Sequence, residues 1–140
     1  ENYMAVQMNV TTRNARLDTI ESTNGTSCAL EIRSGAQPSD CSQASTGSIL
    51  VTINLPTDWM AGAGSGQKAK AGTWQDTTAD NTGVAGHFRI YNSQATKDGT
   101  TCFMQGSCGQ GTGDLSLDNT SIVAGQQVTV NTFTLTDGNA

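Results

Sequence analysis

The sequence predicts an all-β fold, a jelly-roll-like β-sandwich of about seven or eight strands with one short N-terminal helix. Charged residues make up only 14% of the 140 residues, whereas glycine occurs 16 times. Much of the remainder is Thr, Ser, Asn and Gln, a composition that favours strands and turns. Short alternating segments recur at near-regular intervals between turn residues, as in a sandwich or jelly roll. The length fits one domain over residues 1–140.

The first ten residues are expected to form an N-terminal arm, because they are apolar with partial alternation. Such a segment is either a strand or an extended arm that lies on a neighbouring molecule. Its apolar and partly apolar side chains include Tyr3, Met4, Val6 and Met8.

A single helix is predicted over residues 11–23. Thr11 or Thr12 is the expected N-cap, and Asn24-Gly25 ends the helix, since glycine readily adopts the left-handed conformation beyond a helix C-terminus. The apolar stripe of this helix is thin, so we expect it to pack on a partner or on a sheet edge.

Period-2 alternation predicts the strands. In the last predicted strand, the apolar residues change from even positions, up to Val130, to odd positions, from Phe133. Such a change of phase requires a bulge or a bend. Thr57 or Asp58 is expected to cap a helical turn that carries Trp59 and Met60 inward. The strands are expected at residues 28–33, 48–54, 73–77, 84–92, 100–105, 114–118 and 126–136. The expected core is Leu30, Ile32, Ile49, Val51, Ile53, Trp59, Phe88, Ile90, Val128, Val130, Phe133 and Leu135.

The clearest strand, 84–92, carries the single histidine, His87. No G-x-S-x-G elbow presents a serine to it, and no partner for acid–base chemistry is evident, so no catalytic residue is assigned. With Phe88 and Ile90 facing inward, His87, Arg89 and Tyr91 lie on the opposite face and are candidates for an intermolecular contact.

The four cysteines form two local pairs, Cys28 with Cys41 and Cys102 with Cys108. Four cysteines allow three pairings, so spacing does not fix the connectivity. Disulfides or buried free thiols are both favoured over a metal site, because C-x-x-C is absent and His87 is the single imidazole. No metal or other cofactor is expected.

The charge pattern argues against nucleic acid or a membrane as partner. The net charge is −5, and the seven basic residues are spread along the chain without a basic cluster. No apolar run approaches the length that spans a bilayer. One alternative function is a carbohydrate-binding module of a fibre or host-recognition structure, in which Trp59, Trp74 and Tyr91 would stack on sugar rings.

Five strings resemble capsid cement (decoration) proteins of tailed bacteriophages: RNARLD at 13–18, LEIRSG at 30–35, LPTDWM at 55–60, GHFRI at 86–90 and FTLT at 133–136. The resemblance implies a jelly-roll protein in the virion, on the outer capsid surface, assembled in the host cytoplasm. It implies a homodimer that clamps neighbouring copies of the major capsid protein and has no enzymatic activity.

The arm and the helix are under-packed for a free monomer, which makes them candidate contacts to the capsid or to a second copy. The candidate partner-binding residues are Tyr3, Met4, Val6, Met8, Arg13 and Arg16.

Overall fold

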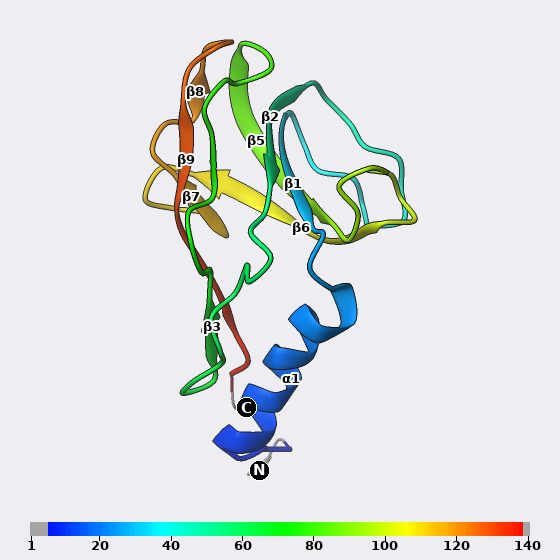
Figure 1. Cartoon of the computed structure of the whole chain (residues 1–140), viewed down its shortest axis with the longest axis vertical. Helices are drawn as coiled ribbons and strands as arrows, with labels where there is room; N and C mark the ends of the chain where they lie inside the picture. Colours follow the sequence, from blue (N-terminus) through cyan, green and yellow to red (C-terminus); the bar gives the residue numbers. More distant parts are fainter. Residues whose placement is uncertain (1–5, 139–140) are drawn as a thin grey trace, which may run out of the picture.

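Nine strands and one helix make up the computed structural model, which describes residues 6–138. The all-β, sandwich-like prediction is confirmed, with nine strands in place of seven or eight (Figure 1). The elements are α1 (Val10–Asn24), β1 (Ala29–Ser34), β2 (Ile49–Asn54), β3 (Gln67–Ala69), β4 (Gln75–Asp76), β5 (Gly83–Tyr91), β6 (Cys102–Gly109), β7 (Leu115–Leu117), β8 (Ser121–Ile122) and β9 (Val128–Thr136).

The strands form one curled sheet in the order β2-β1-β5-β6-β7-β9-β3, with β4 paired to β9 and β8 paired to β5. All of these pairs are antiparallel except β6 with β7, which is parallel. The sheet curls until β4 lies beside β2, where the Thr52 amide donates to Asp76 Oδ2 at 3.2 Å. The apolar side chains of both halves thereby meet in one interior.

The core contains a continuous row of aromatic rings. Phe103, Trp59, Trp74, Phe133 and Phe88 follow one another with centroid separations of 5.8, 6.4, 5.5 and 5.5 Å. These separations and the tilted or edge-on angles are those that aromatic pairs prefer. The aliphatic residues predicted for the core are buried around the row, except that Ile49 and Leu135 are only partly buried.

The helix was predicted within one residue of its ends, but its N-cap is Asn9. The side chain of Asn9 accepts a hydrogen bond from the Thr12 amide at 2.9 Å, so neither Thr11 nor Thr12 is the cap. At the other end Gly25 has φ 80° and donates its amide to the Glu21 carbonyl, as expected for a glycine that ends a helix.

The predicted bulge is present on β9. Ser116 lies opposite Thr132 and Leu117 opposite Val130, so Asn131 is the extra residue. This single insertion lets Val130 and Phe133 both face the core in spite of their opposite parity.

Two local predictions were wrong. Trp59 and Met60 do point inward, with exposed fractions of 0% and 1%, but residues 57–60 form no helical turn. Gly106 lies within β6, which continues to Gly109, whereas the predicted strand ended at residue 105. A Cβ there would be 2.8 Å from the Phe88 ring, so the strand needs a glycine to pass the core.

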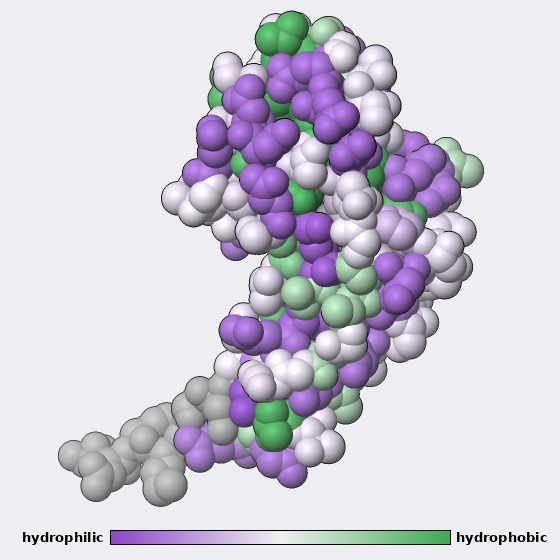
Figure 2. Space-filling view, turned by 60° about the vertical axis from the view of Figure 1, so that its left-hand side comes forward, coloured by the Kyte–Doolittle hydropathy of each residue, from purple (hydrophilic) through white to green (hydrophobic). Residues whose placement is uncertain are grey.

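The molecule is elongated, with a broad strand-rich end and a narrow end (Figure 1). The narrow end consists of α1, β3 and the residues of β9 that pair with β3, Thr134 to Thr136. Figure 2 shows hydrophobic surface at both extremities. The exposed valines are Val6 and Val10 by the narrow end, and Val84 and Val123 beside β8 at the opposite extremity.

Candidate functional site

The narrow end is the candidate interaction surface, because α1 is only weakly embedded in the core. Leu17 is the buried residue of the helix, and Ile20 packs partly against the core. The remaining contacts with the β-structure are mainly hydrogen bonds to backbone groups, which hold the helix without hiding its outer surface. They join the Gly66 amide to Asn14 (2.8 Å), the Ala63 amide to Asp18 (2.9 Å), the Met60 amide to Glu21 (3.2 Å) and Trp59 Nε1 to the Gly25 carbonyl (3.0 Å).

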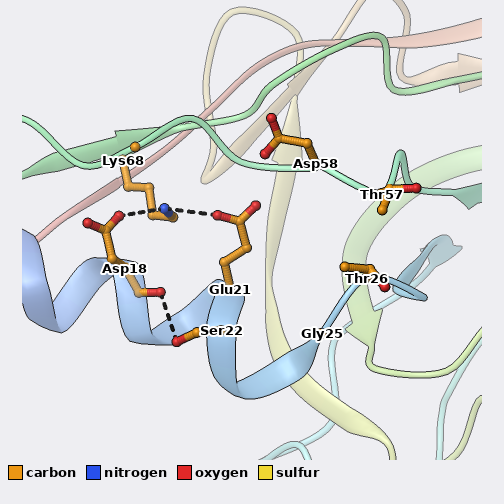
Figure 3. A pocket seen from close by; sticks show the side chains of 9 residues that line it. Asp18, Glu21, Ser22, Gly25, Thr26, Thr57, Asp58 and Lys68 are labelled. Carbon is orange, nitrogen blue, oxygen red and sulfur yellow. Dashed lines mark hydrogen bonds and ion pairs between the residues drawn. The ribbon is translucent and has the colours of Figure 1, made fainter.

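A buried lysine forms the centre of this attachment (Figure 3). Lys68, on β3, is 1% exposed. Its ammonium donates to Asp18 Oδ1 at 2.7 Å and to the Ala61 carbonyl at 2.9 Å, and lies 3.3 Å from Glu21 Oε1. Burial lowers the pKa of Lys68, but the two carboxylates outweigh it and raise the pKa above its ordinary value. Lys68 is therefore a charged structural link and is poorly suited to act as a base or nucleophile.

A cleft of about 660 Å³ runs beside this cluster, between α1 and the segment after β2. Asp58, on the segment after β2, also lines the cleft (Figure 3). Across residues 6–138, no group of three or more His, Cys, Asp or Glu side chains is placed to hold a metal ion. Acidic side chains thus line the cleft, and the buried cation among them, Lys68, is already paired with Asp18 and Glu21.

The two arginines predicted to bind a partner contact the C-terminal segment of their own chain. Arg13 Nη1 donates to the Asp137 carbonyl at 3.0 Å, and Arg16 Nε lies 3.2 Å from the Asp137 carboxylate. Arg13 is half-buried, whereas the Arg16 side chain is 57% exposed. Of the pair, Arg16 retains surface for a further contact.

The predicted arm is partly described. Val6 is 86% exposed, whereas Met8 is half-buried and its sulfur accepts a hydrogen bond from Arg16 Nη1 at 3.5 Å. Tyr3 and Met4 lie outside the described residues. The exposed apolar groups at the start of α1 are thus Val6, which precedes the helix, and Val10, its first residue, at 42% exposure.

The face of β5 that carries His87, Arg89 and Tyr91 was predicted to be open to a partner, and this was wrong. Residues 35–48, here called the covering loop, lie over it, and the three side chains are 1%, 0% and 0% exposed. The loop approaches so closely that a Cβ on Gly86 would be 2.1 Å from the Gly35 carbonyl oxygen.

Arg89 is the main tie between this face and the covering loop. It donates to the carbonyls of Cys41 (2.6 Å) and Gln43 (3.1 Å) and to Ser45 Oγ (2.8 Å). Tyr91 donates to Glu31 Oε1 at 2.7 Å, and Glu31 also pairs with Arg33. Buried polar groups need such partners, so this network explains how charged residues occupy a closed layer.

His87 has the surroundings of a structural histidine. Its Nδ1 lies 2.9 Å from the Gly35 carbonyl, and its Nε2 is buried without a partner among the described residues. Burial lowers the pKa of His87, and the nearby Arg33 and Arg89 lower it further, against the opposing effect of the Gly35 bond. The neighbouring charges are cations, whereas a catalytic triad requires a carboxylate beside the imidazole.

The three rings proposed to bind sugar are all buried. Trp59, Trp74 and Tyr91 each have an exposed fraction of 0%. Trp59 and Trp74 belong to the aromatic row of the core, and Tyr91 lies beneath the covering loop. None of the three presents a face on which a sugar could stack.

All four cysteines are free thiols, and their neighbours differ from those that spacing suggested. Cys28 points to the end of α1, where its sulfur lies 3.6 Å from the Asn24 and Gly25 carbonyls. The Cys41 thiol instead lies against the Cys102 thiol. Cys108 is half-buried, and burial raises the pKa of its thiol to about 12.

Comparison with known proteins identifies no matching family model, no matching curated protein and no matching solved structure. The helix in the described part of the chain is too short and too polar to cross a membrane. The resemblance to capsid cement proteins stays a prediction.

Proposed function

We propose that the chain is a non-enzymatic structural protein that binds the outside of a phage capsid and stabilises the lattice of the major capsid protein. The observation that carries the proposal is the narrow end, where a helix with a single buried residue begins at the exposed Val10 and is preceded by the exposed Val6. A weakly embedded helix with apolar groups at its start is suited to bury that surface against a partner.

The shape supports binding to a repetitive surface. The narrow end is the slender part of the molecule (Figure 1), and interfaces that bury little surface are often weak or transient. On a capsid, many copies occupy equivalent positions, and a dimer engages two of them at once, so weak contacts add through multivalency. We therefore include the homodimer in the proposal. Light scattering of the purified protein measures its molar mass and so tests whether it is a dimer.

The carbohydrate-binding alternative has lost the feature that motivated it. Stacking on sugars needs exposed rings, and Trp59, Trp74 and Tyr91 are fully buried. The exposed apolar side chains nearest to α1 are aliphatic, which suits a protein contact better than a sugar.

Two pairs of exposed valines at opposite extremities provide the test. One variant carries Val6→Asp and Val10→Asp at the narrow end, and the control carries Val84→Asp and Val123→Asp. All four side chains are exposed, so both variants should fold. An aspartate at Val10, the first residue of α1, is also favourable to the helix dipole. Circular dichroism and thermal unfolding establish that the two variants are equally folded.

The binding assay is co-sedimentation with phage heads assembled without this protein. The wild-type chain and the Val84/Val123 variant should sediment with the heads and raise their resistance to heat, and the Val6/Val10 variant should remain in the supernatant. Failure of the wild-type chain to bind or stabilise the heads overturns the function. Loss of binding in the Val84/Val123 variant alone overturns the assignment to the narrow end.

A further inference from the structure

Two cysteines that are 61 positions apart in the sequence, Cys41 and Cys102, are brought together by the covering loop. Cys102 begins β6 and lies directly opposite Tyr91 of β5. Opposed residues of an antiparallel pair point to the same face of the sheet. Cys102 therefore faces the same side as Arg89 and Tyr91, which is the side that the covering loop closes.

The part of the loop that carries Cys41 is held in place from several directions. Arg89 Nη2 donates to the Cys41 carbonyl at 2.6 Å, and Gln105 Nε2 donates to the Pro38 carbonyl at 2.8 Å. Gly99, three residues before Cys102 in the chain, also contacts the loop. A Cβ on Gly99 would lie 2.3 Å from the carbonyl oxygen of Ser42, the residue that follows Cys41. These contacts bracket Cys41 beside Cys102.

The two thiols also interact directly. Burial, followed by the adjacent Cys102 thiol, raises the pKa of Cys41 to about 11, although Arg89 opposes the shift. Cys41 is partly accessible, whereas Cys102 is 8% exposed. Cys41 is therefore the thiol that a reagent reaches first, and its reaction accelerates as the pH rises, because the thiolate is the nucleophile.

We propose that Cys41 and Cys102 form an intramolecular disulfide when the chain meets a low-molecular-weight disulfide such as oxidised glutathione. The Cys41 thiolate attacks one glutathione sulfur, breaks the glutathione disulfide and releases one glutathione thiol. The Cys102 thiolate then attacks Cys41 in the mixed disulfide and releases the second glutathione thiol. Each cysteine loses one proton, the two protein sulfurs are oxidised, and the glutathione disulfide is reduced to two thiols.

In the folded protein the disulfide would fasten the covering loop to β6. In the unfolded chain it would tie together two residues that are far apart in the sequence. Such a cross-link stabilises mainly by lowering the entropy of the unfolded state. For a chain of this length, we expect Tm to rise by about 5–10 °C, with full reversal by dithiothreitol. The proposal concerns the covering loop and does not depend on capsid binding.

The experiment treats the full-length protein with oxidised glutathione at mildly alkaline pH. The four thiols should fall to two, and the intact mass should decrease by two hydrogens. Digestion with trypsin and chymotrypsin separates Cys102 from Cys108 by cleavage after Phe103. Mass spectrometry should then identify a linked peptide pair containing Cys41 and Cys102.

Four single variants complete the test. Cys41→Ser and Cys102→Ser should lose the intramolecular bond and the rise in Tm, and Cys28→Ser and Cys108→Ser should retain both. A Cys28–Cys41 or Cys102–Cys108 peptide in the wild-type protein, or four thiols that persist after treatment, overturns the proposal. The wild-type peptide map keeps the test decisive even where a variant fails to fold.

Discussion

Replacement of Arg89 by methionine tests whether one side chain holds the covering loop against the sheet. Arg89 is fully buried and donates three hydrogen bonds to that loop, at 2.6, 2.8 and 3.1 Å. Methionine fills most of the same volume but donates none of them. The substitution therefore removes the polar tie and largely preserves the packing.

The expected loss is about 2–4 kcal/mol of unfolding free energy. Hydrogen bonds from a charged donor contribute about 1.5–3 kcal/mol each, which would place three of them well above this range. Two effects reduce the sum. The loop carbonyls regain water once the loop lifts, and methionine removes a buried cation whose Nε has no partner among the described residues.

Urea unfolding followed by tryptophan fluorescence measures this loss, since Trp59 and Trp74 are both fully buried. Limited proteolysis with subtilisin should show cleavage within residues 35–48 in the variant before the core unfolds. Arg16→Met is the control, because its side chain is 57% exposed and should cost about 0.5–1 kcal/mol or less. An Arg89→Met protein with wild-type stability and a protected loop would refute the reasoning.

Two further predictions concern the other buried charges. Lys68→Met should lower the unfolding free energy by about 1–3 kcal/mol, because the carboxylates of Asp18 and Glu21 lose a buried partner but keep access to water. Lys70→Met is the matched control, and an equal effect of both changes in urea unfolding would contradict the role of Lys68. His87 has a lowered pKa in the folded state, so the unfolded chain binds more protons below about pH 6.5. The stability that neutral His87 provides is thus present above that pH and lost as the pH falls. In the His87→Gln variant, Tm should therefore fall less steeply as the pH is lowered. A variant whose Tm follows the wild-type pH profile would show that His87 makes no contribution to the pH dependence of stability.

The strands and much of the core could be predicted because the interior imposes a period of two on the sequence. The phase slip predicted a bulge or bend between Val130 and Phe133, since both side chains had to reach the same core, and the strand register shows that Asn131 is the extra residue. The helix ends were found from Gly25 and the polar residues near its start, although Asn9 outcompetes the threonines as N-cap. These signals are local, and they report burial directly.

The covering loop could not be predicted, because it reverses the usual meaning of a polar residue. Glu31, His87 and Arg89 alternate with apolar neighbours, and such a pattern normally marks a face in contact with water. Here the loop between β1 and β2 supplies carbonyls and hydroxyls in place of water, which the composition of the loop does not reveal. The juxtaposition of Cys41 and Cys102 depends on this same loop, so sequence spacing suggested other pairs.

The two ends of the molecule differ in the forces that hold them, and this difference bears on the proposed recognition at the narrow end. The strand-rich end is stabilised by the aromatic row and by a buried polar layer, both of which resist change because any substitution leaves a cavity or an unpaired group. The helix α1 is held largely by hydrogen bonds to side chains that keep partial access to water, such as Asp18 at 50% exposure. Breaking these bonds costs less because water can replace them. Changes to the surface of α1, including those that the proposed partner contact would require, should therefore leave the β-core that supports it intact.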